Sequence, residues 1–345
     1  MVAAICAIAM SAIVTRSLST EGAGAFFLAM SIANFLLLWT TFGVERAALR
    51  FIAENRSAQP STARRTVFLA IAITIASSCT IVCLMGSPIG VLVAERVLHA
   101  PLLAPCMLSV AIWGVLRAIL SAVTESLRGL HRVIPAAVFG AAADRFLCVL
   151  ALGLLFAVAQ DRITLEAVFH IVIGALALCI LCNGFLLWRY MPPQSDRPAH
   201  PILSKMWVVA WPSWLGLLLN FATTRTNLWI LSGCQTSHEV AMFGAALQAS
   251  LLMVLALQVV NGVLPSYVAE MFSQGKRDNV ETLLRTSAFC VTIPALLLLL
   301  GFFVIGRPLL SVAFGPLYSG GYTVLLLLVT AHSVNAVTGS HGVLL

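Results

Sequence analysis

The chain has 345 residues, of which 60% are hydrophobic and 10% are charged, and its formal net charge is +7. Soluble domains carry about one quarter charged residues, so a soluble fold of this length would lack the charge to cover its surface. The composition excludes soluble enzymes, nucleic-acid-binding proteins and disordered regulators. It predicts an all-α polytopic membrane protein.

Ten apolar stretches along the chain are candidates for membrane-spanning helices, for which about 20 residues are needed. They cover residues 1–15, 23–44, 66–94, 102–124, 134–158, 165–188, 207–232, 239–264, 286–305 and 322–340. The first stretch is short and has no basic segment before it, unlike a signal peptide. The sequence also stops within apolar residues at Leu345. We therefore expect a fragment of a longer protein, with its first span clipped.

Basic residues alternate between the loops in the way that a correct span count requires. Thirteen Lys and Arg follow the even-numbered spans: Arg46, Arg50, Arg56, Arg64, Arg65, Arg128, Arg132, Arg189, Arg197, Lys205, Lys276, Arg277 and Arg285. Four follow the odd-numbered spans: Arg16, Arg96, Arg162 and Arg307. Because basic loops remain in the cytoplasm, the N-terminus is predicted to be cytoplasmic.

The loops are too short to form a catalytic domain, since none exceeds roughly twenty residues. Walker, GxGxxG and HExxH motifs are absent from the sequence, which excludes ATP-driven transport within this chain. Cys79/Cys83 and Cys179/Cys182 have helical spacing but no His, Asp or second Cys pair beside them, so we predict no metal site. No enzymatic activity and no cofactor are expected.

An internal repeat relates two segments of the chain. FLAMSIANFLLLWTTFGVERAALRFIAE (residues 27–54) aligns without gaps to FGAALQASLLMVLALQVVNGVLPSYVAE (residues 243–270). The copies lie in the second and eighth predicted spans, so an even number of crossings relates them and the repeats run parallel. Such a repeat predicts two helical lobes around a central cavity, as in many secondary transporters. We expect an N-terminal six-helix lobe over 1–190, a cytoplasmic linker over 191–206 and an incomplete C-terminal lobe over 207–345.

Several segments carry a family resemblance. TRSLSTEGAGAFFLAMSIANF and FGVERAALRFIAE near the start, and WPSWLGLLLNFATTRTNLWIL, AMFGAALQ, VLPSYVAEMFSQGKRDNVETLLR and LLSVAFGPLYSGG later, are the segments concerned. They resemble bacterial polysaccharide-biosynthesis membrane proteins, the lipid-linked oligosaccharide (O-antigen type) flippases of the multidrug/oligosaccharidyl-lipid/polysaccharide exporter superfamily. The similarity extends over essentially the whole chain, through degenerate apolar patterns.

The resemblance implies a function in surface polysaccharide biosynthesis. A member of this family moves a polyprenyl-pyrophosphate-linked oligosaccharide across the bacterial cytoplasmic membrane by alternating access, driven by an ion gradient or the membrane potential. The lipid-linked oligosaccharide and membrane lipids are then the expected partners, together with the polysaccharide polymerase and glycosyltransferases of the same process. No nucleic acid is expected to bind.

Away from the ends of the predicted spans, four charged residues fall inside them: Arg117, Arg145, Arg225 and Asp144. A charge within a membrane helix is costly, so such residues face a partner or an aqueous cavity. Arginine keeps its charge and offers a fork of donors that matches phosphate oxygens. We therefore predict that the three arginines bind the pyrophosphate head group. A structural alternative is that Asp144 neutralises Arg117 on the neighbouring span.

Polar residues in the spans are candidates for contacts with the glycan, and they are Asn34, Asn220, Thr223, Thr224 and Asn227. Arg46, Arg50 and Glu54 share one helical face at the cytoplasmic interface. The two arginines are gate candidates for first capture of the phosphate. The alternative is that this amphipathic helix end attracts anionic lipids.

Two related functions remain open. A multidrug or cation antiporter of the same superfamily would need acidic residues in its cavity, whereas the charges within the spans are net positive. A flippase for lipid-linked peptidoglycan precursors would use the same chemistry as the first interpretation. The sequence does not identify the glycan, the coupling ion or the oligomeric state.

Overall fold

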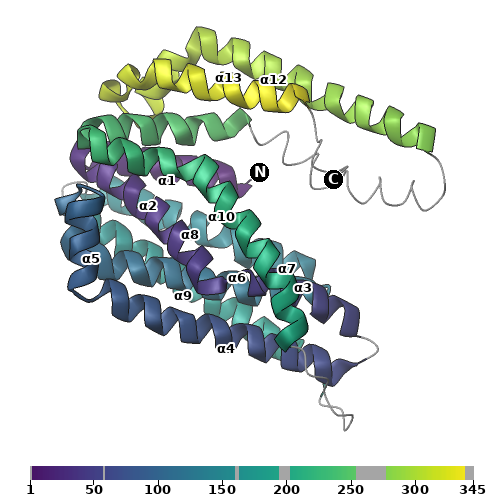
Figure 1. Cartoon of the computed structure of the whole chain (residues 1–345). Helices are drawn as coiled ribbons and strands as arrows, with labels where there is room; N and C mark the ends of the chain where they lie inside the picture. Colours follow the sequence, from purple (N-terminus) through teal and green to yellow (C-terminus); the bar gives the residue numbers. More distant parts are fainter. Residues whose placement is uncertain (1, 57–58, 160–162, 194–202, 254–276, 339–345) are drawn as a thin grey trace. The chain divides into compact units, whose positions relative to one another are not determined.

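The computed structural model describes residues 2–56, 59–159, 163–193, 203–253 and 277–338 (Figure 1). Within these ranges the chain is built from helices, and no strand is present. Eight of the helices are long and apolar enough to cross a membrane, and a shorter apolar helix spans Val2–Ser17. The prediction of an all-α polytopic membrane protein is confirmed.

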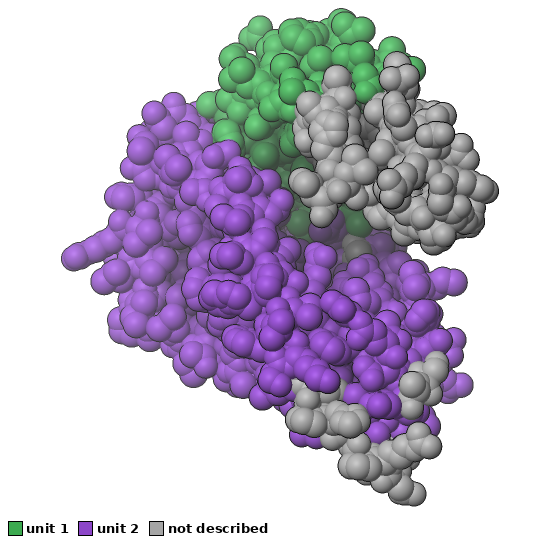
Figure 2. All heavy atoms as spheres, turned by 45° about the vertical axis from the view of Figure 1, so that its right-hand side comes forward, with its two compact units in different colours: residues 1–16, 242–345 green, residues 17–241 purple. Residues whose placement is uncertain are grey.

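The chain divides into two compact units, which Figure 2 shows in different colours. Unit 1 contains Met1–Arg16 and Met242–Leu345, and unit 2 contains Ser17–Ala241. Unit 2 therefore combines the first predicted lobe, apart from its first span, with the seventh predicted span. The lobe boundaries at 190 and 207 stay a prediction, because much of the predicted linker lies outside the described residues.

Unit 2 is a bundle of membrane-length helices (Figure 1). Its α-helices are α2 (Thr20–Thr41), α3 (Val44–Asn55), α4 (Pro60–Met85), α5 (Pro88–Leu92), α6 (Met107–Gly129), α7 (Val133–Ala137), α8 (Ala143–Ala159), α9 (Leu165–Arg189) and α10 (Leu203–Cys234). Shorter turns of other helix types join them, namely η1 (Val93–Val97), η2 (Pro101–Cys106) and η3 (Val138–Ala142). Helix α6 packs on α2, α3, α4 and α9 and so forms the centre of the bundle.

Local sequence signals set the ends of these helices. The Ser19 hydroxyl accepts a hydrogen bond from the Gly22 N–H at 3.1 Å at the start of α2, as an N-cap residue does. The Thr164 hydroxyl does the same for Ala167 at the start of α9. Helix α2 ends at Phe42, whose left-handed backbone directs its N–H to the Leu38 carbonyl.

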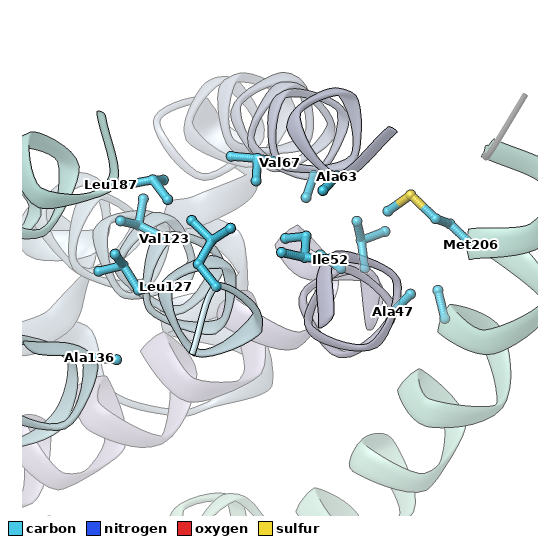
Figure 3. Close-up of a cluster of buried hydrophobic side chains, with 14 residues drawn as sticks. Ala47, Ile52, Ala63, Val67, Val123, Leu127, Ala136, Leu187 and Met206 are labelled. Atoms are coloured by element: carbon cyan, nitrogen blue, oxygen red, sulfur yellow. The ribbon is translucent and has the colours of Figure 1, made fainter. Parts of the chain in front are cut away.

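A buried apolar cluster joins α3 to its neighbours (Figure 3). Helix α3 contributes Ala47 and Ile52, which pack beside residues of α4, α6 and α10. Burying a large aliphatic side chain such as Ile52 contributes about 1.5–3 kcal/mol. The amphipathic segment after the first long span is therefore fixed within the bundle by its apolar face, while Arg46 and Arg50 remain exposed.

Unit 1 contains α1 (Val2–Ser17), α12 (Arg277–Phe314), the short turn η5 (Pro316–Gly321) and α13 (Tyr322–Thr338). Helices α12 and α13 run alongside each other (Figure 1). Arg16 at the end of α1 donates to the carbonyls of Val312 and Ala313, which lack helical partners in the last turn of α12. Of the predicted span over 239–264, residues up to 253 are helical and the remainder lies outside the described residues.

Candidate functional site: a polar cavity among membrane helices

One face of α6 carries an unusual run of polar side chains for a membrane span. Arg117, Ser121, Thr124, Glu125 and Arg128 recur at helical spacing and line one cavity in unit 2. The cavity has a volume of about 160 Å³, and Leu37 of α2, Gly140 of η3 and Leu176 of α9 also line it. Its size and lining suit a small polar group.

A π-helical turn shapes the opposite wall of this cavity. The turn η3 directly precedes α8, and the first turn of α8 brings both Asp144 and Arg145 to the cavity. A single π-helical turn within a longer helix is rare and is frequent at functional sites. Gly140 in this turn lies so close to α6 that an added Cβ would be 2.4 Å from the Thr124 side chain. The close approach explains why a residue without a side chain stands here.

Of the three arginines predicted from the sequence, Arg117 and Arg145 line the cavity together with Asp144, whereas Arg225 does not line it. Arg117 lies within electrostatic range of Arg145, Asp144 and Arg225, and Arg225 within range of Arg145. All four side chains are partly buried. The group carries three positive charges and one negative charge, so its net charge is positive in a region of low dielectric constant. Placing one arginine in a membrane helix costs about 2.5–3.5 kcal/mol on insertion scales, so an anion bound here would offset a large penalty.

Two buried polar atoms at this site have no hydrogen-bond partner: Oδ1 of Asp144 and Nη1 of Arg225. The Thr124 hydroxyl, which faces the same cavity, is a third. A buried polar group without a partner costs about 1–3 kcal/mol. Three such groups lie at or near one charged cluster, so hydrogen-bonding capacity is left over there.

On helix α10, Arg225 lies on a different face from the polar residues that the sequence analysis grouped with it. Asn220, Thr223, Thr224 and Asn227 recur at i, i+3, i+4 and i+7, so they form one stripe, and all four are exposed. Arg225 follows Asn220 by five residues and points roughly 140° away. The structure therefore places Arg225 with the other arginines and the two asparagines on a different face.

Aromatic packing holds α10 against α2. Trp214 donates from Nε1 to the Leu38 carbonyl at 2.9 Å, and Trp229 donates from Nε1 to the Ser31 hydroxyl at 3.0 Å. The Phe35 ring lies against the Trp229 ring, with their centroids 5.0 Å apart. These contacts flank Arg225 along the helix and fix which way its side chain points.

The remaining predicted residues lie elsewhere. The Asn34 amide donates to the Met30 carbonyl of its own helix at 2.6 Å, and its side chain is partly buried. Arg50 pairs with Glu54 at 2.8 Å, and both are exposed. Arg46 and Arg50 do not line the cavity, and their role as a gate stays a prediction.

Sequence reasoning missed four residues that line the cavity: Ser121, Thr124, Glu125 and Arg128. Glu125 and Arg128 pair at 2.7 Å at the end of the cavity away from Arg117. The signal was available, because these positions continue the helical face on which Arg117 lies. Among the described residues, no group of three or more His, Cys, Asp or Glu side chains is placed to hold a metal ion.

Comparisons with known proteins agree with this architecture. The model of the family described as "Polysaccharide biosynthesis protein" matches residues 1–269. The curated proteins give no match. A multidrug resistance MATE family transporter of the MOP superfamily, in an inward-facing conformation, is a similar solved structure with a TM-score of 0.74 and 15% identity, over 99% of this chain and 83% of that chain.

Two further solved structures share the fold. MATE in complex with MaD3S has a TM-score of 0.64 at 15% identity, over 99% of this chain and 80% of that chain. A MOP superfamily transporter from Pyrococcus furiosus, described as having a binding pocket of reverse polarity that suggests a different function, has a TM-score of 0.50 at 14% identity, again over 99% and 80%. At such identities the likeness shows the fold. With the family model covering most of its length, the chain belongs to the polysaccharide biosynthesis protein family, and it is a multi-pass membrane protein with the fold of MATE transporters.

Proposed function

We propose that this protein is a flippase for a polyprenyl-pyrophosphate-linked oligosaccharide, acting by alternating access in the bacterial cytoplasmic membrane for surface polysaccharide biosynthesis. Its N-terminus is then cytoplasmic, as the loop charges predict. The observation that carries the proposal is that Arg117 and Arg145 line a polar cavity with Asp144, while Arg225 lies within electrostatic range of both arginines. The polymerase and glycosyltransferases of the same process are the proposed protein partners.

The chemistry of the head group fits this charge distribution. A pyrophosphate diester carries two negative charges, which must leave water to cross the bilayer. Three arginines and one aspartate give a net charge of +2, which the head group neutralises. Charge-assisted hydrogen bonds from guanidinium groups replace the phosphate's hydration, and each contributes about 1.5–3 kcal/mol. The group therefore lowers the barrier to an anion and raises it for a cation.

The exposed stripe on α10 supplies contacts for the sugar residues. Asn220 and Asn227 present amides on this face, and the Thr223 and Thr224 hydroxyls beside them donate to carbonyls of their own helix. Polar side chains on an exposed face of a membrane helix belong beside water rather than lipid. Val208, Leu219 and Ile230 form the adjoining exposed apolar face, which suits lipid. We assign the polar stripe to the aqueous path taken by the glycan.

A multidrug or cation antiporter is the second candidate, because the similar solved structures include multidrug resistance transporters. A cation-binding cavity would require net negative charge, opposite to that of the arginine group described above. The Pyrococcus furiosus structure shows that reverse polarity of the pocket has been connected with a different function on this fold. A flippase for peptidoglycan-precursor lipids would share the proposed chemistry and differ in its glycan.

Transport of a labelled lipid in sealed vesicles tests the proposal. A labelled polyprenyl-pyrophosphate glycan is placed in one leaflet of proteoliposomes containing the full-length protein, and its appearance in the other leaflet is followed. We expect transport by the wild type and its loss in Arg117→Ala, Arg145→Ala and Arg225→Ala. Arg189→Ala is the matched control, because Arg189 is exposed at the end of α9 and does not line the cavity.

The outcomes separate the candidates. Normal transport in all three arginine variants would refute the role of the arginine group. Absence of lipid transport together with efflux of organic cations would favour the antiporter. Transport of peptidoglycan-precursor lipid in preference to an O-antigen-type glycan would change the assigned substrate and leave the cavity chemistry in place.

A further inference from the structure

A buried glutamate follows the sharp bend between α2 and α3. Phe42 and Gly43 both have left-handed backbones, with φ of 47° and 72°, and together they form an elbow that ends one helix and begins the next. Glu45 lies in the first turn of α3, outside the membrane-spanning candidates, and is only 4% exposed. Its Oε2 makes no hydrogen bond of normal geometry, although the Thr41 hydroxyl is near enough to favour the charged form of the carboxyl. A buried carboxylate oxygen in this state is costly, whereas the neutral carboxylic acid is much less so.

The surroundings of Glu45 favour the neutral form. Burial raises the pKa of Glu45 above its ordinary value, and the negative charge of Glu125 on α6 adds to the shift. Interactions of the carboxyl with the Glu45 backbone N–H and the Thr41 side chain lower this pKa, as does the positive charge of Arg46. These effects do not cancel the rise. The apolar face of α3, which includes Val44 and Ala48, packs in one buried cluster with residues of α4 and α10.

The elbow is in direct contact with α10, the helix that carries Arg225. A Cβ added to Gly43 would lie 2.4 Å from the Ala210 carbonyl oxygen and 2.9 Å from the Trp214 nitrogen, so the two backbones touch. The Phe42 ring also packs against Trp207 and Trp214 of α10. A change in packing at the elbow is therefore passed to α10.

Glu45 also interacts electrostatically with a residue that lines the polar cavity. Glu125, whose charge acts on Glu45, lines the cavity and pairs with Arg128. When Glu45 is ionised, it repels Glu125. When Glu45 takes up a proton from water, that repulsion ends and the carboxyl no longer requires hydration.

We propose that Glu45 is a proton-binding site at the α2–α3 elbow, and that its occupancy couples the proton gradient to the position of α10 and to the charge of the cavity. The protonated state keeps α3 and the elbow buried against α10. The ionised state favours exposure of the carboxylate and loosens this contact. Because the folded state favours the protonated form, this contribution to the stability of the elbow is present at low pH and is lost as the pH rises. The proposal does not depend on which substrate the transporter carries.

Tryptophan fluorescence as a function of pH tests the proposal, since Trp207 and Trp214 lie against the elbow. The full-length protein in lipid nanodiscs is titrated from about pH 4 to pH 8, a range that covers ordinary and raised carboxyl pKa values. We expect a transition with a midpoint above that of an ordinary glutamate. Glu45→Gln mimics the protonated side chain and is expected to lose the transition, with an emission like that of the acid form at every pH.

Two further variants make the test specific. Glu125→Gln removes the neighbouring negative charge and is expected to move the midpoint to lower pH while keeping the transition. Glu54→Gln, on the same helix but exposed, is the matched control and is expected to behave as the wild type. A wild type without any transition, or a transition of unchanged midpoint in Glu45→Gln, would overturn the proposal. No substrate is present, so failure here is separate from failure of the proposed flippase function.

Discussion

Gly43→Ala is expected to destabilise unit 2 strongly, although it adds a single methyl group. Gly43 has φ of 72°, and the left-handed conformation costs a residue with a Cβ roughly 1–2 kcal/mol. The new Cβ would lie 2.4 Å from the Ala210 carbonyl oxygen, a backbone atom that cannot turn aside. Overpacking of this kind costs about 1–3 kcal/mol. The sum is about 2–5 kcal/mol.

Thermal unfolding in detergent, followed by tryptophan fluorescence, measures this effect. An apparent Tm roughly 4–20 °C below that of the wild type is expected, at about 2–4 °C for each kcal/mol. Gly216→Ala is the matched control: Gly216 lies on the contacted helix α10, and nothing lies within 4 Å of its added Cβ. That variant should match or slightly exceed the wild type, because alanine favours helix. Equal Tm values for the two variants would refute the described contact between the elbow and α10.

Three further substitutions test the site and its support. Trp214→Phe removes the donor to the Leu38 carbonyl and should lower the free energy of unfolding by about 1 kcal/mol, measured by the same unfolding assay; a loss below about 0.3 kcal/mol would contradict the hydrogen bond. Gly140→Ala should lower the Tm because its Cβ overlaps the Thr124 side chain, and the double variant with Thr124→Ala should recover part of that loss, since only the Thr124 Cβ then remains at 3.0 Å; no recovery would count against the overlap. Arg117→Leu should abolish transport while leaving Tm unchanged or raised, because it removes a costly charge; a large drop in Tm would instead indicate a structural pair with Asp144.

The sequence predicted the helical architecture well because hydrophobic length and loop charge are strong signals in membrane proteins. The predicted span over 134–158 corresponds to the helical run Val133–Val158, and that over 165–188 to Leu165–Arg189. Less was predictable where the chain departs from regular α-helix. The π-helical turn before Asp144 has no signature in the apolar sequence that forms it, so the way it brings two adjacent charges to one cavity could not be foreseen.

Helix periodicity could have improved the predicted site. It places Arg225 and Asn220 on different faces of α10, and it places Ser121, Thr124 and Arg128 on the face of Arg117. Glu45 is a different case. Its position in an amphipathic segment beside Arg46 is typical of a solvated surface residue, and only tertiary packing buries it to 4% exposure. The direction of α3 at the elbow, which depends on two left-handed residues, decides this burial.

The affinity of the purified protein for an anionic lipid tests the central claim most directly. In nanodiscs, binding of a polyprenyl-pyrophosphate glycan is compared with that of the same glycan on an uncharged polyprenol, for the wild type and Arg145→Gln. We expect the pyrophosphate lipid to bind the wild type at least about tenfold more tightly, which is 1.4 kcal/mol, and Arg145→Gln to lose most of that preference. Equal affinity for the two lipids, or a preference unchanged by the substitution, would contradict a cavity that selects its substrate by negative charge.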